Sequence, residues 1–504
     1  MKRRAFTKYL ASVGAATMVK SSLANPLSNL QSYVELPAPL TGSHSVELCL
    51  NSRVSTHGGY NGTLDNQILA NTLWAASKAP LLCNSRNIYV ALPDGVYFYS
   101  PEKNRLYLQI DGNHLSEKNL AFEIGITNNP PDVAEDAGAA LHWAQLASVA
   151  FWGSTADQPV CCPKDSGYIY ANDHWELDSD VPIVNCYGRM SSVPGIKSQL
   201  VAKSSDNSLP DPLTDGNVIL EDAIREPIFT SNFTDDDLST QQLSQIAWAA
   251  YGCTPHYIST KAGLTVASWN AQYYLTGHIY IITSDSVFKF HMRNSSGETS
   301  SQDHRIELVK SGDCRSLLRE ASGRISQTAP VYFIFCASST DRPQLLEAGY
   351  CGSSALLQTT SLGLGGHYCA NFNDSERNAI KNAIGLQSNI QPLLIFSAGK
   401  QLKTSILPLN KNYQDISKIE TRPNPFHSFV SVSFSFFSAQ RVEAAIFDTA
   451  GKKIRNLPTG NKVKTGFSLV WDGCNENGNR VKAGTYIFRI THSSKTKSIL
   501  LHKI

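Results

Sequence analysis

The chain has 504 residues, with 44 basic and 42 acidic side chains and a formal net charge of +2. This balance gives no global electrostatic argument for a nucleic-acid or anionic-membrane partner, and the length predicts about three domains. Charged residues make up only 17% of the chain, below the roughly 25% usual for globular proteins, which favours an exported protein. The 11 cysteines show no CxxC spacing, so we expect no metal site.

The N-terminus predicts a signal peptide over residues 1–24. Met1–Arg4 is a basic head, Tyr9–Val19 is a short apolar run, and Ser22–Ala24 provides small residues for cleavage. The adjacent arginines also fit the twin-arginine signal, so that route and general secretion both stay open. No later segment approaches the ~20 apolar residues of a membrane span. We therefore expect a cell-surface or extracellular protein, with the periplasm as the alternative.

Residues 41–203, here called copy one, alternate between helical and extended patterns. An amphipathic helix is predicted over Leu64–Ser77 and a long Ala-rich helix over Ala134–Ala150. The predicted strands are Asn87–Leu92 and Gly95–Ser100, which form a hairpin, followed by Asn104–Gln109 and Pro182–Cys186. The polar stretch Ser204–Leu213 reads as a linker to the next domain.

Residues 214–405, here called copy two, show the same kinds of element. Ser239 is the expected N-cap of an amphipathic helix that ends at Gly252. The other predicted elements are strands at His278–Thr283, Ser286–His291, Pro330–Ala337 and Pro392–Ser397 and helices at Arg315–Ser322 and Ala348–Leu362. Alternating helices and strands indicate a layered α+β or α/β architecture.

The two copies are related by an internal duplication. Trp74 and Trp248 lie in similar helical stretches 174 positions apart. Ala137-Gly138 matches Ala348-Gly349 at an offset of 211, and Gly188-Arg189 matches Gly399-Lys400 at the same offset. The matches stay in order along the chain, with insertions only in copy two, as expected for a repeated domain.

Residues 418–504 have a different pattern. Short alternating segments are separated by Gly, Asn and Pro, and no helical periodicity appears. The predicted strands are Val430–Phe437, Val442–Ile446, Lys452–Arg455, Phe467–Trp471, Gly484–Ile490 and Ser498–His502. This spacing is typical of an immunoglobulin-like β-sandwich.

Each copy resembles the nitroreductase family, in particular the branch of azoline-oxidising dehydrogenases. The resemblance covers most of residues 45–400. It is carried by Arg53–His57, Ala79-Pro80, Asn84–Arg86, Thr265–Asn270, Ala329–Val331, Leu362–Gly365 and Gly399-Lys400. It implies an α+β fold in which two subunits interlock and FMN lies between them. Two tandem nitroreductase-like domains would then form an internal pseudo-dimer within one chain.

The resemblance also implies the residues that bind the cofactor. In copy one, Arg53, Ser55 and His57 match the family's phosphate-binding element, and Arg189 matches its second phosphate cation. An arginine and a hydroxyl suit a phosphate because they supply charge-assisted hydrogen bonds. The alternative is that they are ordinary surface and loop residues.

Copy two departs from this pattern. Pro227, Phe229 and Ser231 occupy the places of the phosphate element, which leaves Lys400 as the matched cation. Each missing charge-assisted bond is worth about 1.5–3 kcal/mol, so we expect at most one FMN per chain. Ser268 and Asn270 are the candidate donors to the flavin ring, or else turn residues that bond to nearby backbone. The sequence identifies no catalytic acid, base or nucleophile.

The C-terminal segment resembles the sorting domain of type IX secretion substrates, akin to the sandwich of flagellar hook-capping proteins. The elements that carry the resemblance are Pro423–Phe426, Ile446–Gly451, Trp471–Gly473, Ala483–Tyr486 and Lys497–Ile504. It implies that the secretion machinery is a partner that reads this domain. The alternative is a sandwich that serves stability alone.

Two functions follow from these observations. The first is an exported FMN-dependent oxidoreductase that acts on a small molecule or a peptide azoline. The second is a surface-displayed binding or structural protein that keeps the scaffold without the cofactor. The altered phosphate element of copy two favours the second, and the four matched residues of copy one favour the first.

Overall fold

A computed structural model describes residues 33–55, 60, 64–131, 133–150, 159–189, 207–258, 261–293, 302–402, 420–422, 424–434, 442–449, 451–457, 467–492 and 495–504. The predicted signal peptide, 1–24, lies outside these residues. The chain divides into two compact units, Met1–Leu402 and Lys403–Ile504. Each unit is described by itself below.

Copy one has two short N-terminal helices, a three-stranded meander and a long central helix. Its elements are β1 (Tyr33–Glu35), α1 (Val46–Ser52), α2 (Asn66–Lys78), β2 (Ser85–Leu92), β3 (Gly95–Ser100), β4 (Arg105–Asp111), β5 (Phe122–Asn129), α3 (Ala134–Val149), β6 (Pro159–Lys164), α4 (Asp165–His174) and β7 (Val184–Arg189). The predicted hairpin and the Ala-rich helix are confirmed to within two residues.

Copy two repeats this order with insertions. Its elements are α5 (Leu220–Arg225), α6 (Thr240–Tyr251), β8 (Cys253–Ile258), β9 (Lys261–Leu264), η2 (Trp269–Ala271), β10 (Ile279–Ile282), β11 (Ser286–Arg293), β12 (Gln302–Ser311), α7 (Arg315–Ala321), β13 (Val331–Ala337), α8 (Arg342–Ser361), β14 (Gly365–Ala370), α9 (Asp374–Ile384) and β15 (Gln391–Gly399). The β8–β9 hairpin, η2 and α7 have no counterpart among the described residues of copy one.

The two sheets have the same strand order. Copy one runs β4-β3-β2-β5-β7-β6, with β1 added at the β4 edge, and copy two runs β12-β11-β10-β13-β15-β14. All neighbouring strands in both sheets pair antiparallel. An identical order over six strands confirms the duplication and the α+β class.

The two copies meet along a local pseudo-twofold axis. The backbone at Ser45 pairs with that at Ile219. At the offset of 174, Ile219 is the copy-two counterpart of Ser45. On either side, Val46 N–H donates to Val218 O at 3.0 Å, and Leu220 N–H donates to His44 O at 3.0 Å. Reciprocal contacts of this kind are those of a symmetric dimer interface, so the predicted internal pseudo-dimer is confirmed.

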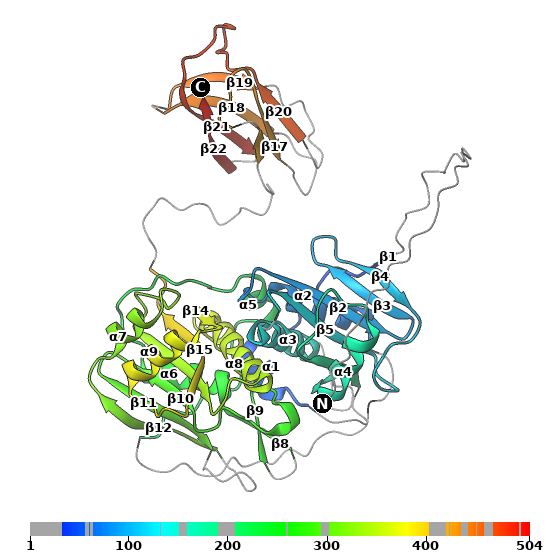
Figure 1. Ribbon diagram of the computed structural model, residues 1–504, viewed down its shortest axis with the longest axis vertical. Coiled ribbons are helices and arrows are strands. Elements are labelled where there is room, and N and C mark those ends of the chain that lie inside the picture. The colour runs from blue at the N-terminus through cyan, green and yellow to red at the C-terminus, as the bar shows by residue number, and fades with distance from the viewer. Residues whose placement is uncertain are drawn as a thin grey trace, which may run out of the picture. The chain divides into compact units, whose positions relative to one another are not determined.

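The central helices α3 and α8 lie side by side between the two sheets (Figure 1). Every residue of α3 is buried. A helix that is buried on all sides needs no polar face, which explains why Ala dominates α3. The Trp143 Nε1–H donates to Ser353 O of α8 at 3.1 Å and joins the two copies.

A local sequence signal accounts for the start of α6 but not for that of α8. Ser239 caps α6 through Gln242 N–H at 3.2 Å, and the Gln242 side chain returns a bond to Ser239 N–H at 2.9 Å. The prediction that the second central helix begins at Ala348 is wrong, because α8 begins at Arg342. Its polar first turn, with Pro343 near the start, hides the helical pattern there.

The predicted linker is only partly a linker. Residues 204–206 lie outside the described residues, but Leu209 is 2% exposed and donates its N–H to His304 O at 3.0 Å. Leu213 N–H bonds to the Gln245 side chain at 2.8 Å. Polar composition suggested a solvated stretch, but its described residues form hydrogen bonds with copy two.

The second unit is a β-sandwich. Its two antiparallel sheets contain β16 (Glu420–Arg422), β17 (Val430–Phe434) and β20 (Phe467–Trp471) on one side and β19 (Lys453–Leu457), β18 (Val442–Asp448), β21 (Gly484–His492) and β22 (Lys495–Lys503) on the other. Trp471 is fully buried and contacts the rings of Phe426 and Tyr486, with centroids 5.4 and 5.1 Å away. The predicted β-sandwich is confirmed.

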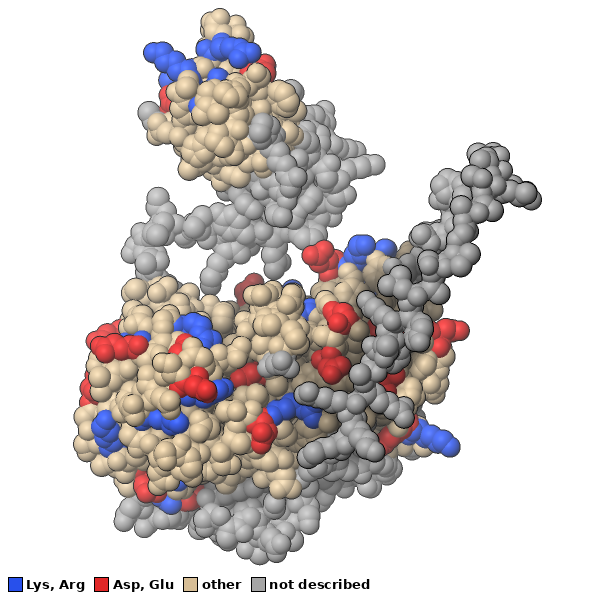
Figure 2. Space-filling view, in the orientation of Figure 1, with Lys and Arg blue, Asp and Glu red and all other residues tan. Residues whose placement is uncertain are grey.

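Three further observations concern the surface and the thiols. The described cysteines whose side chains are placed are free thiols, most of them buried. Within the described ranges no helix has both the length and the hydropathy to cross a bilayer. On the face of the first unit in Figure 2, acidic and basic side chains are interspersed.

Candidate functional site

Arg53 lies at the end of α1, where copy one meets the β9 strand of copy two. Its Nε–H donates to Thr265 O at 3.1 Å, and its Nη2 donates to Leu264 O at 2.7 Å. Its Nη1 donates to Ser55 Oγ at 2.8 Å. Arg53 is only 4% exposed. The predicted phosphate cation and its neighbouring hydroxyl therefore lie together, at the junction between the copies.

Arg53 also shapes the electrostatics of its surroundings. Burial, and then the nearby Arg53 charge, lower the pKa of His142 in α3 to about 3 and that of His256 in β8 to about 4. Both imidazoles are therefore neutral at neutral pH. The positive charge at this junction is that of the guanidinium.

Arg189 lies at the carboxyl end of β7. The Tyr60 ring covers the preceding residue, since a Cβ at Gly188 would lie 2.7 Å from that ring. Tyr60, seven residues after Arg53 in the chain, thus packs against the end of β7. That Arg53 and Arg189 bind one phosphate stays a prediction. His57 lies outside the described residues.

Ser268 precedes η2 in copy two, close in sequence to the carbonyls that Arg53 binds. Its hydroxyl donates to the buried Glu347 carboxylate and accepts Tyr273 N–H at 2.7 Å. These are contacts within copy two, of the kind expected for a turn residue. Asn270 is in η2, and its side chain lies outside what is described. The role of both residues at a flavin ring stays a prediction.

The segment of copy two that corresponds to the phosphate element packs against β14 of its own copy. The Phe229 ring stacks on His367 at a centroid distance of 5.1 Å, and Thr230 N–H donates to Gly366 O at 2.9 Å. A Cβ at Gly365 would lie 2.5 Å from Thr230 Cγ2. Lys400, the matched cation, is exposed and lies 3.6 Å from Asp236. Whether Lys400 contacts a phosphate stays a prediction.

Two buried carboxylates, which the sequence analysis did not identify, support the loops after α2 and α6. Asp136 in α3 accepts Arg86 Nη2 at 2.6 Å, Arg86 Nε at 2.7 Å and Leu82 N–H at 2.8 Å. Glu347 in α8 accepts the Tyr251 hydroxyl and Leu275 N–H, the latter at 3.1 Å. Their numbers differ by 211, so the offset found for Gly138 and Gly349 could have identified the pair.

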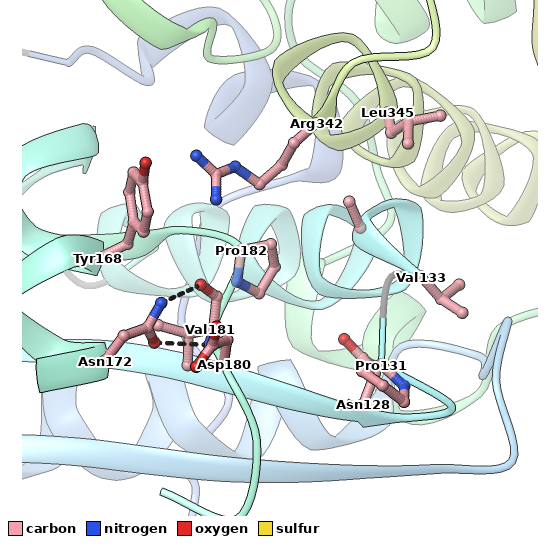
Figure 3. Close-up of a pocket in the computed structure, with 11 residues that line it drawn as sticks. Asn128, Pro131, Val133, Tyr168, Asn172, Asp180, Val181, Pro182, Arg342 and Leu345 are labelled. Carbon is pink, nitrogen blue, oxygen red and sulfur yellow. Dashed lines mark hydrogen bonds between the residues drawn. The ribbon is translucent and has the colours of Figure 1, made fainter. Parts of the chain in front are cut away.

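A cavity of about 360 Å³ lies at the amino-terminal ends of α3 and α8 (Figure 3). Copy one provides most of its wall, and copy two provides Arg342 and Leu345. In Figure 3 the Arg342 side chain extends across the cavity toward Tyr168. Its guanidinium carbon lies 3.9 Å from the centroid of the Tyr168 ring and 5.2 Å from that of Trp269. The described Asp, Glu, His and Cys residues contain no cluster suited to a metal ion.

Comparisons with known proteins give a domain match and a likeness of fold. Residues 433–496 match the model of the FlgD Ig-like domain. No curated protein matches the chain.

Solved structures similar to the first unit carry nitroreductase descriptions. One from Anabaena variabilis is 12% identical, with a TM-score of 0.49, and the match covers 74% of this chain and 94% of that chain. One from Ralstonia eutropha is 20% identical, with a TM-score of 0.32, and the match covers 42% of this chain and 98% of that chain. An FMN-dependent nitroreductase from Clostridium difficile is 14% identical, with a TM-score of 0.24, and the match covers 36% of this chain and 86% of that chain.

The residues of copy one fit an FMN phosphate in part. The Arg53 guanidinium and the Ser55 hydroxyl are the right chemistry for a phosphate and lie within hydrogen-bonding distance of each other. However, the three described bonds of Arg53 all go to protein oxygens. Two of these acceptors are backbone carbonyls of copy two, so Arg53 also holds the two copies together.

Proposed function

We propose that the chain is an FMN-dependent oxidoreductase of the nitroreductase type that binds one flavin, in the groove of copy one. The observation that carries this proposal is the Arg53–Ser55 pair at the junction of the two copies. The nitroreductase descriptions of similar structures agree with it. FMN would supply the hydride chemistry itself, and the chain's own residues would bind and orient it.

In this proposal Arg53, Ser55, His57 and Arg189 hold the phosphate, and Ser268 and Asn270 approach the ring. The substrate is a small molecule or a peptide azoline. Copy two keeps the fold as a structural partner, because it has Phe229 where copy one has Ser55 and this ring stacks on His367 of its own copy.

Flavin content of the purified protein tests the proposal. We expect flavin absorbance, release of about one FMN per chain on denaturation, and rebinding of FMN by the stripped protein. Arg189→Gln should weaken rebinding by about tenfold or more, the cost of a charge-assisted bond. Arg455→Gln, in the second unit, is the matched control and should leave rebinding unchanged. Loss of FMN in Lys400→Gln instead would place the flavin in copy two.

The second candidate is a binding or structural protein without a cofactor. The specific observation that favours it is that two nitrogens of Arg53 donate to the backbone carbonyls of Leu264 and Thr265 in copy two, which gives this arginine a structural role. A colourless protein that does not bind added FMN would establish this function and reject the first.

We also propose that the protein is exported and that the C-terminal sandwich directs type IX secretion to the cell surface. The support is the signal-like N-terminus and the match of residues 433–496 to an Ig-like domain. In a host with type IX secretion, removal of residues 418–504 should retain the protein in the periplasm. Unchanged surface display of the truncated chain, measured by protease shaving, would reject this role.

A further inference from the structure

We propose that the cavity beside Arg342 binds a small monoanionic organic acid, a carboxylate attached to a planar ring. Arg342 recognises the carboxylate, and the apolar wall holds the ring. This site does not depend on whether the groove of copy one holds a flavin, since its wall contains none of the residues matched to the phosphate.

The first argument is the state of the Arg342 side chain. It projects from the first turn of α8, and its Nε is buried with no hydrogen-bond partner among the described residues. It stacks on Tyr168 at 3.9 Å, which holds the planar guanidinium in one orientation. A buried N–H donor without a partner is unfavourable, so a ligand oxygen that pairs with this guanidinium would stabilise it.

The second argument is that other polar groups of the wall are already committed. The Asn172 amide exchanges two hydrogen bonds with the Val181 backbone, at 2.8 and 3.2 Å (Figure 3). The Asn128 amide donates to Asp136 at 2.5 Å. Arg342 is the cation among the described residues of the wall. One fork-shaped cation suits a carboxylate, which pairs with it in a bidentate manner, better than a phosphate, which needs several donors.

The third argument concerns the remainder of the cavity. Val133 and Ala134 are buried, and Leu345 and Pro182 are half-buried, so these four side chains form an apolar part of the wall. Its volume of about 360 Å³ is within the range of small-molecule pockets, roughly 300–1,000 Å³. Asp180 lines the site but is itself exposed. A carboxylate there disfavours ligands of higher negative charge.

Calorimetric titration of the full chain with benzoate, and with the neutral isostere benzamide, tests the inference. We expect benzoate to bind and benzamide to bind at least about tenfold more weakly, because it lacks the charge that Arg342 recognises. Arg342→Gln should weaken the binding of benzoate by about the same factor and leave the binding of benzamide unchanged. Arg455→Gln is the matched control and should bind benzoate as the unaltered chain does.

A second variant protects the test against a folding defect of Arg342→Gln. Leu345→Trp keeps the arginine but fills the cavity, so it should abolish benzoate binding while thermal unfolding stays cooperative. Equal binding of benzoate and benzamide, undiminished binding in either cavity variant, or no benzoate binding by the unaltered chain would overturn the inference.

Discussion

Gly138 of α3 and Gly349 of α8 make reciprocal contacts with each other's helix. A Cβ at position 138 would lie 2.3 Å from Leu346 O, and one at position 349 would lie 2.1 Å from Glu135 O. Both pairs of contacting residues are related by the offset of 211, so the contact obeys the pseudo-twofold symmetry. Close approach of the central helices therefore requires glycine at both positions.

Alanine at either glycine should destabilise the first unit. Because the clash is with backbone, the helices must separate, and we expect a loss of about 1–3 kcal/mol in the free energy of unfolding. Urea denaturation measures it. Gly323→Ala is the control, since a Cβ there meets nothing within 4 Å. Equal stability of Gly138→Ala and Gly323→Ala would contradict the described helix packing.

Removal of Arg86 should be costly because it leaves the Asp136 carboxylate buried without its cation. The two side chains are 3% and 0% exposed. We expect Arg86→Met to lower the free energy of unfolding by about 3–5 kcal/mol, with part of the loss recovered in the double variant Arg86→Met/Asp136→Leu. Arg105→Met removes an exposed pair with Glu35 and should change stability little. A similar effect of both single variants would refute the role assigned to burial.

His142 should make stability fall in mild acid. Burial and Arg53 lower its folded-state pKa to about 3, whereas an unfolded histidine titrates near 6.5. The unfolded chain therefore binds the proton first, and stability that is present above about pH 6.5 is lost as the pH falls toward 3. Between pH 6.5 and 5 this loss is about 2 kcal/mol.

The measurement is denaturant unfolding of the unaltered chain and His142→Gln at pH 7, 6 and 5. At pH 7 the variant should be less stable than the unaltered chain. Its free energy of unfolding should decrease less as the pH falls to 5, because glutamine does not titrate. Parallel decreases in the two proteins would show that His142 is protonated in the folded state.

The two compact units should unfold independently. Because the sandwich has its own buried core around Trp471, removal of residues 403–504 should leave the thermal transition of the first unit unchanged. Calorimetry of the full chain should show two transitions. A transition of the first unit that moves by several degrees on truncation would reveal coupling between the units.

The sequence by itself determined the local elements and the duplication. Hydrophobic periodicity and caps such as Ser239 depend on nearby residues, so the elements that they define were predicted closely. The duplication was predicted from matched pairs such as Gly138 and Gly349, which keep their order along the chain. The helices α1 and α4, whose helical pattern spans few turns, were not predicted. The helix α9 was also missed, although its Asn373–Glu376 capping box is a clear local signal. The start of α8 was placed six residues too late because its first turn is polar.

Only the tertiary structure decided how the candidate sites are built. Arg53 matched a phosphate-binding pattern, but its hydrogen bonds go to Leu264 and Thr265, more than 200 positions away. The packing of Phe229 on His367 and the cavity beside Arg342 likewise depend on contacts between distant segments. A short stretch of sequence specifies the type of side chain, whereas the partner it contacts is set by the packing of one copy against the other.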